Sequence, residues 1–215
     1  MPSWEIENEF SGNICGIDEA GRGPWVGPVV AAAVMFLTHD INAELLNNLN
    51  DSKKLTAKKR EYLYDLLLNE AQKGKLCYGI AEASAREIDD LNILNATFLA
   101  MRRAAEKLSI KPDKALIDGN RLPTDFCCPT NCYISGDARS YSIAAASILA
   151  KVYRDRLMQE MAQKYPGYGF AKNAGYGTKD HIDGLKKYGV TPQHRHSYKP
   201  IKEFLANENV KINCD

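Results

Sequence analysis

The sequence predicts a mixed α/β fold, in which helices flank a sheet and a helical region follows at the C-terminal end. Three observations support this prediction. Two apolar runs typical of strands open the chain, strands and helices alternate after them, and a long helical pattern follows the last predicted strand. The 215 residues are enough for one large domain or two small ones.

The first third of the chain holds the elements with the plainest patterns. Apolar runs over 14–18 and 29–36 are typical of strands, and we expect the glycine-rich connection between them to close a hairpin. Thr56 is the predicted N-cap of a helix over 57–72. Alternation over 76–83 predicts a third strand.

The remaining elements are predicted from caps and apolar patterns. Ser84-x-x-Glu87 is a capping box that opens a short helix. Small residues fill the first part of a long helix over 140–164, and they favour close packing on the sheet. The other predicted elements are a helix over 92–108, strands over 115–118 and 131–134, a helix over 178–188 and a helical tail over 191–215.

The composition is that of an ordinary globular protein. Hydrophobic residues make up 45% and charged residues 26%, with a net charge of +1. This charge excludes a protein whose whole surface is basic, but it is compatible with a local basic patch. No apolar run is long enough to span a bilayer and no secretory signal opens the chain. We therefore expect a cytoplasmic protein without a membrane partner.

Cysteines and basic runs are interpreted as ordinary structural features. The chain has six cysteines, and nothing points to an oxidising compartment, so we expect reduced thiols. Cys127, Cys128 and Cys132 have no histidine or further cysteine pair nearby to complete a tetrahedral zinc site. The basic run over 58–60 is interpreted as a solvated helix face.

Four carboxylates end or follow predicted strands. Asp18 and Glu19 end the first strand, Asp118 ends the strand over 115–118, and Asp137 follows the strand over 131–134. If these strands are neighbours, their ends bring the acids together. A set of oxygen ligands without cysteine or histidine suits Mg²⁺ or Mn²⁺ and not Zn²⁺. Since successive strand side chains point to opposite faces, we expect the chain to twist away at Glu19.

Each acid also has a purely structural interpretation when it is taken alone. Asp118-Gly119 is an ordinary turn signal, and Asp137 is well placed to cap a helix. Gly21-Arg22-Gly23 directly follows the first two acids and would let backbone amides approach a sugar or phosphate, although a tight hairpin turn explains it as well. Its spacing matches neither a dinucleotide fingerprint nor a P-loop.

Several motifs in one register resemble the ribonuclease HII family, the type 2 ribonucleases H. The first is Gly16-Ile-Asp18-Glu19-Ala-Gly-Arg-Gly-Pro24, and the resemblance extends from about residue 14 to residue 199. The others are Asp51-Ser52-Lys53-Lys54-Leu55, residues 87–97, Leu116-Ile-Asp118-Gly119, Gly136-Asp137 with residues 142–152, Tyr168-Gly-Phe170, Gly175-Tyr176 and His194-Arg195.

The resemblance implies a ribonuclease H-like catalytic domain over 1–190 and a C-terminal helical tail over 191–215 that packs on it or extends from it. It implies an endonuclease that cuts the RNA strand of RNA–DNA hybrids and nicks DNA duplexes 5′ of embedded ribonucleotides. The implied cofactor is Mn²⁺ or Mg²⁺, two ions per site, and the implied products carry 3′-hydroxyl and 5′-phosphate ends. We expect a monomer, and we identify no sliding-clamp motif in 201–215, although some bacterial members end with one.

The resemblance also implies roles for individual residues. The residues that match the family's metal-binding and catalytic carboxylates are Asp18, Glu19, Asp118 and Asp137. Those that match its loop for the ribose 2′-hydroxyl are Gly21, Arg22 and Gly23, and Tyr176 matches the tyrosine that senses the RNA-to-DNA junction. Further candidates for contacts with the substrate backbone are Lys53, Lys54, Asn95, Thr97, Ser147 and Lys151.

Some positions depart from the commonest family pattern, and alternative functions stay open. The residues that differ from the commonest family pattern are Ser135, Asn173-Ala174, His196 and Tyr198. These differences affect the expected details of substrate binding and leave the carboxylates unchanged. One alternative is a nuclease or transferase of the same fold that acts on DNA alone. Another is a non-catalytic nucleic-acid binding module, and ribonuclease HIII is a third, within the enzyme class.

Overall fold

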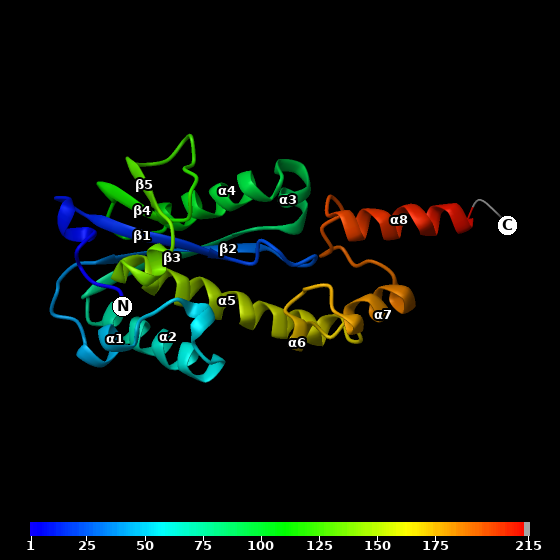
Figure 1. The fold of residues 1–215 in the computed structure, drawn as a ribbon, viewed down its shortest axis with the longest axis horizontal. Coiled ribbons are helices and arrows are strands. Elements are labelled where there is room, and N and C mark those ends of the chain that lie inside the picture. Colours follow the sequence, from blue (N-terminus) through cyan, green and yellow to red (C-terminus); the bar gives the residue numbers. More distant parts are fainter. Residues whose placement is uncertain (213–215) are drawn as a thin grey trace.

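The centre of the molecule is a five-stranded sheet with the strand order β3-β2-β1-β4-β5 (Figure 1). The structure, a computed structural model, describes the backbone of residues 1–212 and the side chains of residues 1–207. The strands are β1 (Ile14–Ala20), β2 (Val29–Phe36), β3 (Leu76–Ala83), β4 (Lys114–Asp118) and β5 (Thr130–Tyr133). Strands β1, β2 and β3 pair antiparallel, whereas β1, β4 and β5 pair parallel. The predicted mixed sheet and the β1–β2 hairpin are confirmed.

Strand β1 is longer than the sequence predicted. It pairs with β2 through Ala20, with Asp18 opposite Ala32 and Glu19 opposite Ala31. The expectation that the chain twists away at Glu19 is wrong, because β2 pairs with β1 from Gly16 to Ala20, beyond Glu19. The pleat therefore continues, and the side chains of Asp18 and Glu19 leave the strand on opposite faces.

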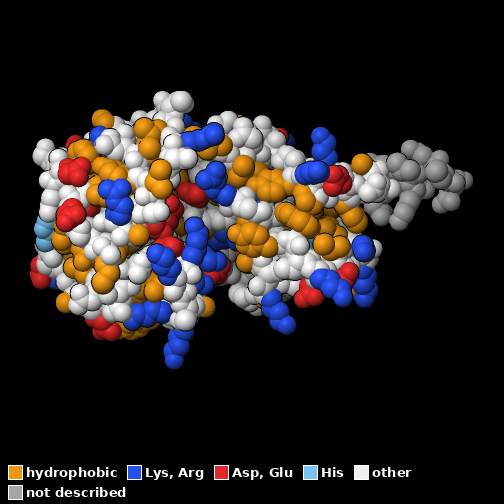
Figure 2. Space-filling model, in the orientation of Figure 1, with side chains coloured by type: hydrophobic (Ala, Val, Ile, Leu, Met, Phe, Trp, Pro, Cys, Tyr) orange, Lys and Arg blue, Asp and Glu red, His pale blue; other side chains and the backbone are white. Residues whose placement is uncertain are grey.

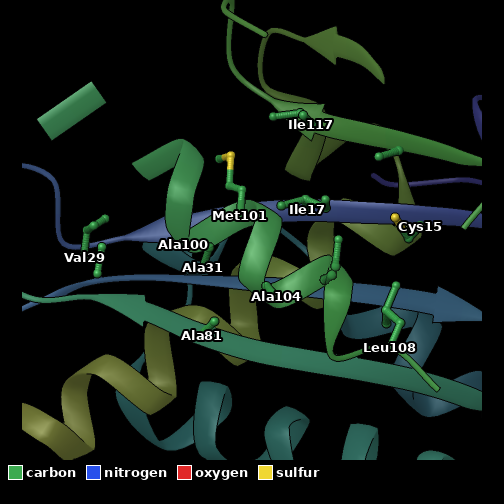
Figure 3. Packing of buried hydrophobic residues seen from close by; sticks show 14 of the residues in the cluster. Cys15, Ile17, Val29, Ala31, Ala81, Ala100, Met101, Ala104, Leu108 and Ile117 are labelled. Atoms are coloured by element: carbon green, nitrogen blue, oxygen red, sulfur yellow. The ribbon is translucent and has the colours of Figure 1, made fainter. Parts of the chain in front are cut away.

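Helices cover both faces of the sheet, and the side chains of β2 alternate between them. On one face, α4 (Ile93–Glu106) packs over the sheet, with Ala100, Met101 and Ala104 near Ile17 and Ala31 (Figure 3). The opposite face packs against α1 (Ala43–Asn48), α2 (Ala57–Gln72) and α5 (Tyr141–Lys164). The β2 residues in the first cluster are Val29, Ala31, Ala33 and Met35, and those in the second are Val30, Ala32 and Val34.

Helix α5 lies unusually close to β1. A Cβ atom on Gly16 would lie 2.2 Å from the carbonyl carbon of Ser142 and 2.3 Å from the nitrogen of Ile143, so only glycine fits there. All residues over 142–150 are buried. The small side chains of this helix therefore serve close packing, as the sequence predicted, and they bring Ser147 and Lys151 past the end of β1.

Local caps begin most of the predicted helices. The Thr56 hydroxyl accepts the N–H of Lys59 and begins α2, and the capping box of Ser84 and Glu87 begins α3 (Ala85–Leu91). Ser140 caps α5 by accepting the N–H of Ile143. Helices α1 and α6 (Phe170–Asn173) were not predicted, because six and four residues are too few for a helical period to show.

A helical region lies at one end of the molecule, beyond the sheet (Figure 1). It consists of α6, α7 (Lys179–Tyr188) and α8 (Lys199–Ile212), and it packs around a cluster of its own. The buried members of that cluster are Val26, Met158, Tyr168, Phe170, Leu185 and Ile201. The predicted C-terminal helical region is confirmed, whereas the division into 1–190 and 191–215 stays a prediction.

Two further expectations concern the cysteines and the membrane. Cys15, Cys77, Cys127, Cys128 and Cys132 are free, and Cys214 lies outside the described residues. Among the described residues, the helices are too short or too polar to cross a bilayer.

Candidate active site

Three parallel strands end at the same edge of the sheet and bring acids there. Ile17 lies opposite Ile117 in the β1–β4 ladder, so Asp18 and Asp118 follow side by side. Asp118 pairs in turn with Tyr133 of β5, and the 3₁₀ turn η3 (Gly136–Ala138) after that strand carries Asp137. The predicted acids therefore lie together at the carboxyl ends of neighbouring strands.

Backbone amides orient two of these acids. The N–H of Glu19 donates to Oδ1 of Asp18 at 2.6 Å, and the N–H of Gly136 donates to Oδ1 of Asp118 at 2.7 Å. A Cβ atom on Gly136 would lie 2.7 Å from Cδ1 of Ile143. A side chain at this position would therefore have to displace the end of the buried Ile143 side chain, next to the turn that holds Asp118.

Burial and mutual repulsion disfavour the ionised form of these carboxyl groups. Burial raises the pKa of Asp18, and the charges of Glu19 and Asp118 raise it further. Burial, followed by the charge of Asp118, raises the pKa of Asp137 to about 6. Burial also raises the pKa of Glu19, although Arg22 opposes the shift. Added positive charge would therefore favour the ionised form of these three groups.

Two cationic side chains supply part of that charge. Nη1 of Arg22 lies 3.4 Å from Oε1 of Glu19. Burial alone would lower the pKa of Lys53, in the turn η2 (Ser52–Lys54), but nearby acids outweigh it and raise that pKa above its ordinary value. These acids are Asp18, Asp51, Asp118 and Asp137. Arg22 and Lys53 thus place two positive charges beside four carboxylates, which is too few to balance them.

The chemistry of the donor set suits a hard divalent cation. The four side chains offer oxygen donors only, which Mg²⁺ and Mn²⁺ prefer. Within residues 1–207, no three acidic, histidine or cysteine side chains stand close enough to enclose an ion without moving. In these positions the acids match a divalent cation by their donor chemistry alone, and water and substrate phosphate would have to complete its coordination.

A cleft of about 740 Å³ opens beside the carboxylates. The predicted site residues in its wall are Asp18, Glu19, Gly21, Arg22, Gly23, Lys53, Ser147, Lys151 and Tyr176. A second cleft of about 370 Å³ shares Glu19 and Arg22 and is lined also by Thr97 and Asp118. Glu19 and Arg22 thus line both clefts.

Three predicted site residues lie outside both linings. Asp137 is buried beside Asp118, whereas Lys54 and Asn95 are exposed on adjoining segments. On the face drawn in Figure 2, lysine and arginine side chains gather around the hollow between the sheet layers and the C-terminal helices. One group of positive side chains therefore lies beside this hollow, on a chain with a net charge of +1.

Three arginines support the cleft and were not among the predicted site residues. Arg154 of α5 is 1% exposed and donates to the carbonyl oxygens of Val26, Pro28 and Ala174. Arg195, also buried, donates to carbonyl oxygens of the Gly-Arg-Gly loop. The third is Arg60, which lines the larger cleft.

The interpretation of 58–60 as a solvated face is wrong for Arg60. Its Nη1 donates to the carbonyl oxygens of Ser52 and Leu55 at 3.0 and 2.7 Å. The sequence held one signal for Arg154, which follows Ser147 and Ala150 at helical spacing on the buried stripe of α5. It held no comparable local signal for Arg60 or Arg195.

Replacing Gly21 by alanine is expected to destabilise the protein by about 3 kcal/mol, because two costs add. Gly21 has a φ of +95°, and a Cβ atom there would lie 1.9 Å from Nε of the buried Arg154. Gly74→Ala is the matched control, since Gly74 has a φ of +71° and open space around it. The control is expected to cost about 1 kcal/mol. Urea unfolding measures both, and equal losses would contradict the role of the close approach to Arg154.

Comparison with known proteins agrees with this geometry. A family model described as Ribonuclease HII matches residues 15–201. The chain is 52% identical over 212 residues to Ribonuclease HII of Ruegeria pomeroyi, and the alignment covers 97% of this chain and 87% of that protein. These matches extend across β1 to α8 and include every residue that lines the two clefts.

Solved structures share the fold. The crystal structure of the ribonuclease H2 from Pyrococcus horikoshii OT3 has a TM-score of 0.74 and 26% identity, and covers 92% of this chain and 99% of that chain. Bst-RNase HIII in complex with Mn²⁺ has a TM-score of 0.70 at 17% identity, covers 91% of this chain and 70% of that one, and shows the fold alone. The chain therefore belongs to the ribonuclease HII family of metal-dependent endonucleases, which act on RNA–DNA hybrids.

Proposed function

We propose that this protein hydrolyses the RNA strand of RNA–DNA hybrids and also nicks DNA duplexes on the 5′ side of embedded ribonucleotides. One observation carries the proposal. The same cleft of about 740 Å³ is lined by Asp18 and Glu19, by the Gly-Arg-Gly loop and by Tyr176. A phosphodiester and its neighbouring ribose therefore fit one site.

The acids form the hydrolytic part of this proposal. Asp18, Glu19, Asp118 and Asp137 would hold two divalent ions, Mg²⁺ or Mn²⁺. Bound ions of this kind activate water and stabilise the leaving oxygen of an in-line displacement. The protein contributes buried carboxylates in fixed orientations, and burial strengthens their attraction to a cation. The expected products carry 3′-hydroxyl and 5′-phosphate ends.

The Gly-Arg-Gly loop and Tyr176 form the ribose-reading part. RNA differs from DNA by the 2′-hydroxyl, so a sequence-independent enzyme must contact that group. A Cβ atom on Gly23 would lie 3.2 Å from Cε1 of Tyr176, so the tyrosine ring lies directly against the loop. Tyr176 is 52% exposed, which leaves much of its side chain free to contact a ribose.

Other residues of the cleft are suited to contacts with the nucleic-acid backbone. Lys53, Ser147 and Lys151 line it, and phosphate contacts of this kind position a duplex without reading its sequence. Thr97 is 2% exposed and its hydroxyl donates to the carbonyl oxygen of Ile93, which supports a structural role more than a direct contact. Lys54 is exposed and lies outside both clefts, so a contact between it and the substrate has less support.

The test is cleavage of a DNA duplex that contains one ribonucleotide, with Mg²⁺ or Mn²⁺, beside the same duplex in all-DNA form. We expect a nick 5′ of the ribonucleotide that EDTA abolishes and that the all-DNA duplex does not show. Equal cutting of both duplexes would instead indicate a general nuclease. Binding without cutting of either would indicate a binding module.

Replacing Tyr176 by alanine is expected to weaken the distinction between substrates. Loss of the ring removes packing next to the ribose, while the carboxylates keep their own backbone contacts. We expect kcat/KM to fall about tenfold or more on the single-ribonucleotide duplex, and less on a uniform hybrid. Tyr188→Ala is the control, because Tyr188 is equally exposed on α7 and lies outside both clefts. An unchanged preference in Tyr176→Ala would refute the assigned role.

We expect the enzyme to act as a monomer. We identify no sliding-clamp motif in the sequence over 201–215, so no clamp partner is proposed.

A further inference from the structure

Two adjacent buried residues, His194 and Arg195, contact the two halves of the proposed ribose-reading site. They are 1% and 0% exposed, respectively. Both lie outside the clefts and far along the chain from the carboxylates on β1. Their partners are the Gly-Arg-Gly loop on one side and, through His181, the backbone of Tyr176 on the other.

Arg195 orients the peptide groups of the Gly-Arg-Gly loop. It donates to the carbonyl oxygens of Gly21 at 2.6 Å, Arg22 at 2.9 Å and Gly27 at 2.9 Å. A trans peptide places its N–H opposite its C=O. Because the carbonyls of Gly21 and Arg22 are turned toward the buried guanidinium, the following N–H groups are turned away from it, to the side where this loop lines the cleft.

The Tyr198 hydroxyl adds a second donor to this loop. It accepts from Nη1 of Arg195 at 2.9 Å and donates to the carbonyl oxygen of Arg22. One carbonyl therefore receives two donors from the C-terminal segment. This hydroxyl can be removed by a single isosteric substitution.

A chain of hydrogen bonds connects His194 to the backbone of Tyr176, and its geometry defines both tautomers. The N–H of Thr191 donates to Nδ1 of His194 at 2.8 Å, so the proton of a neutral His194 ring is on Nε2. That nitrogen lies 3.1 Å from Nε2 of His181, which must accept. The proton of His181 is then on Nδ1, which donates to the carbonyl oxygen of Tyr176 at 3.0 Å.

Both rings are suited to this neutral arrangement. Burial, together with the charge that His181 would carry, lowers the pKa of His194 to about 4. Burial also lowers the pKa of His181. Two facing Nε2 atoms can share one proton but cannot hold two, so the neutral pair is the form that this contact requires.

The two halves are also joined directly. The N–H of Trp25 donates to the carbonyl oxygen of Gly175, and the N–H of Arg195 donates to the carbonyl oxygen of Trp25, at 2.9 and 2.8 Å. The segment after the Gly-Arg-Gly loop therefore lies between the Tyr176 turn and the His194–Arg195 pair. A movement of either half is transmitted to the other through these backbone contacts.

We propose that His181, His194 and Arg195 are positioning residues that hold the Gly-Arg-Gly loop and Tyr176 in register, so that ribose discrimination depends on this buried hydrogen-bond chain. The inference rests on the proposed function, because discrimination has meaning only for an enzyme that reads ribose. The carboxylates have separate supports on β1, β4 and η3. A substitution that breaks this hydrogen-bond chain is therefore expected to change substrate preference more than the rate of metal-dependent hydrolysis.

The first test compares three variants on α7. His181→Leu removes the donor to the carbonyl oxygen of Tyr176, whereas His181→Asn keeps an amide N–H near the position of Nδ1. Leu185→Ala loosens the neighbouring buried cluster and leaves all the residues of the hydrogen-bond chain in place. Activity is measured on the single-ribonucleotide duplex and on a uniform hybrid, with Tm recorded for each variant. We expect His181→Leu to lower the ratio of the two kcat/KM values about tenfold, and His181→Asn to restore most of it.

Leu185→Ala is expected to lower Tm and leave the ratio unchanged. A ratio that falls equally in His181→Leu and Leu185→Ala would reduce the histidine to a structural role and overturn the proposal. Tyr198→Phe is the gentler second variant, since it removes only the hydroxyl that donates to Arg22. Tyr198→Phe is also expected to lower the ratio of the two kcat/KM values. An unchanged ratio in this variant would contradict the proposal that these hydrogen bonds position the Gly-Arg-Gly loop.

Amide hydrogen exchange tests the coupling without any substrate, and so separates it from the proposed function. We expect His181→Leu to accelerate exchange over 174–178 and also over 20–26, while Leu185→Ala leaves 20–26 unchanged. Exchange that accelerates over 174–178 alone would refute the coupling. Equal cutting of the single-ribonucleotide duplex and its all-DNA counterpart by the wild-type enzyme would refute the proposed function, whatever the exchange shows.

Discussion

Replacing Asp18 by asparagine is expected to lower turnover by about three orders of magnitude. In the proposed mechanism Asp18 is a charged ligand to an ion that contributes several kcal/mol of transition-state stabilisation, and the substitution makes this ligand neutral. Asp18 is 6% exposed, lies beside Asp118 and accepts the N–H of Glu19. Asparagine keeps the size and one acceptor oxygen, so the fold is expected to persist. Single-turnover cleavage measures the loss, and circular dichroism confirms the fold.

The same substitution is expected to raise the Tm of the metal-free protein. Burial and then the charges of Glu19 and Asp118 raise the folded-state pKa of Asp18. A carboxyl whose pKa is raised on folding contributes its stability at low pH and loses it as the pH rises through the folded-state value. The gain in Asp18→Asn is therefore expected at pH 7 to 8 and should vanish toward the ordinary carboxyl pKa of about 4.

Asp65→Asn on α2 makes the same chemical change at an exposed position and is the matched control. It is expected to leave turnover and Tm unchanged. A folded Asp18→Asn protein with substantial cleavage would remove Asp18 from the catalytic set. A lower metal-free Tm in Asp18→Asn would contradict the electrostatic account of the site.

Replacing Arg154 by methionine is expected to lower the free energy of unfolding by about 3 kcal/mol, because buried carbonyl groups lose their donors. Arg154 reaches the carbonyl oxygens of Val26, Pro28 and Ala174 from one guanidinium. Burial lowers its pKa, to about 10, so it stays charged at neutral pH and its hydrogen bonds are charge-assisted. Removing the charge also removes its desolvation cost, and this limits the loss.

Arg156→Met is the control for this change. Arg156 lies two residues further along α5, with a side chain 47% exposed and paired with Glu61 at the surface. Its loss is expected to cost less than about 1 kcal/mol. Urea unfolding compares the two variants. Cleavage is expected to fall in Arg154→Met alone, since the Gly-Arg-Gly loop lies against that side chain, and equal effects on stability would refute the role of Arg154.

The elements that the sequence predicted well are those with local causes. The helix over 57–72 and the strands over 29–36 and 76–83 have the predicted bounds, because caps and alternation act between residues close in the chain. The acids could be placed together because they follow strands that end at one edge of the sheet. The roles of the site residues came from the family resemblance, and they stay predictions until the variants are measured.

The sequence by itself determined the order of strands and helices, the small-residue face of α5, and the hard-oxygen character of the donor set. Only the tertiary structure decided how far β1 extends, since its last residues are held by β2. It also decided that Arg154 and Arg195 are buried supports and that Arg60 is a half-buried one. The backbone carbonyls that accept from Arg154 and Arg195 lie 20 to 174 residues away along the chain, so no local pattern can show that these carbonyls compensate their charge.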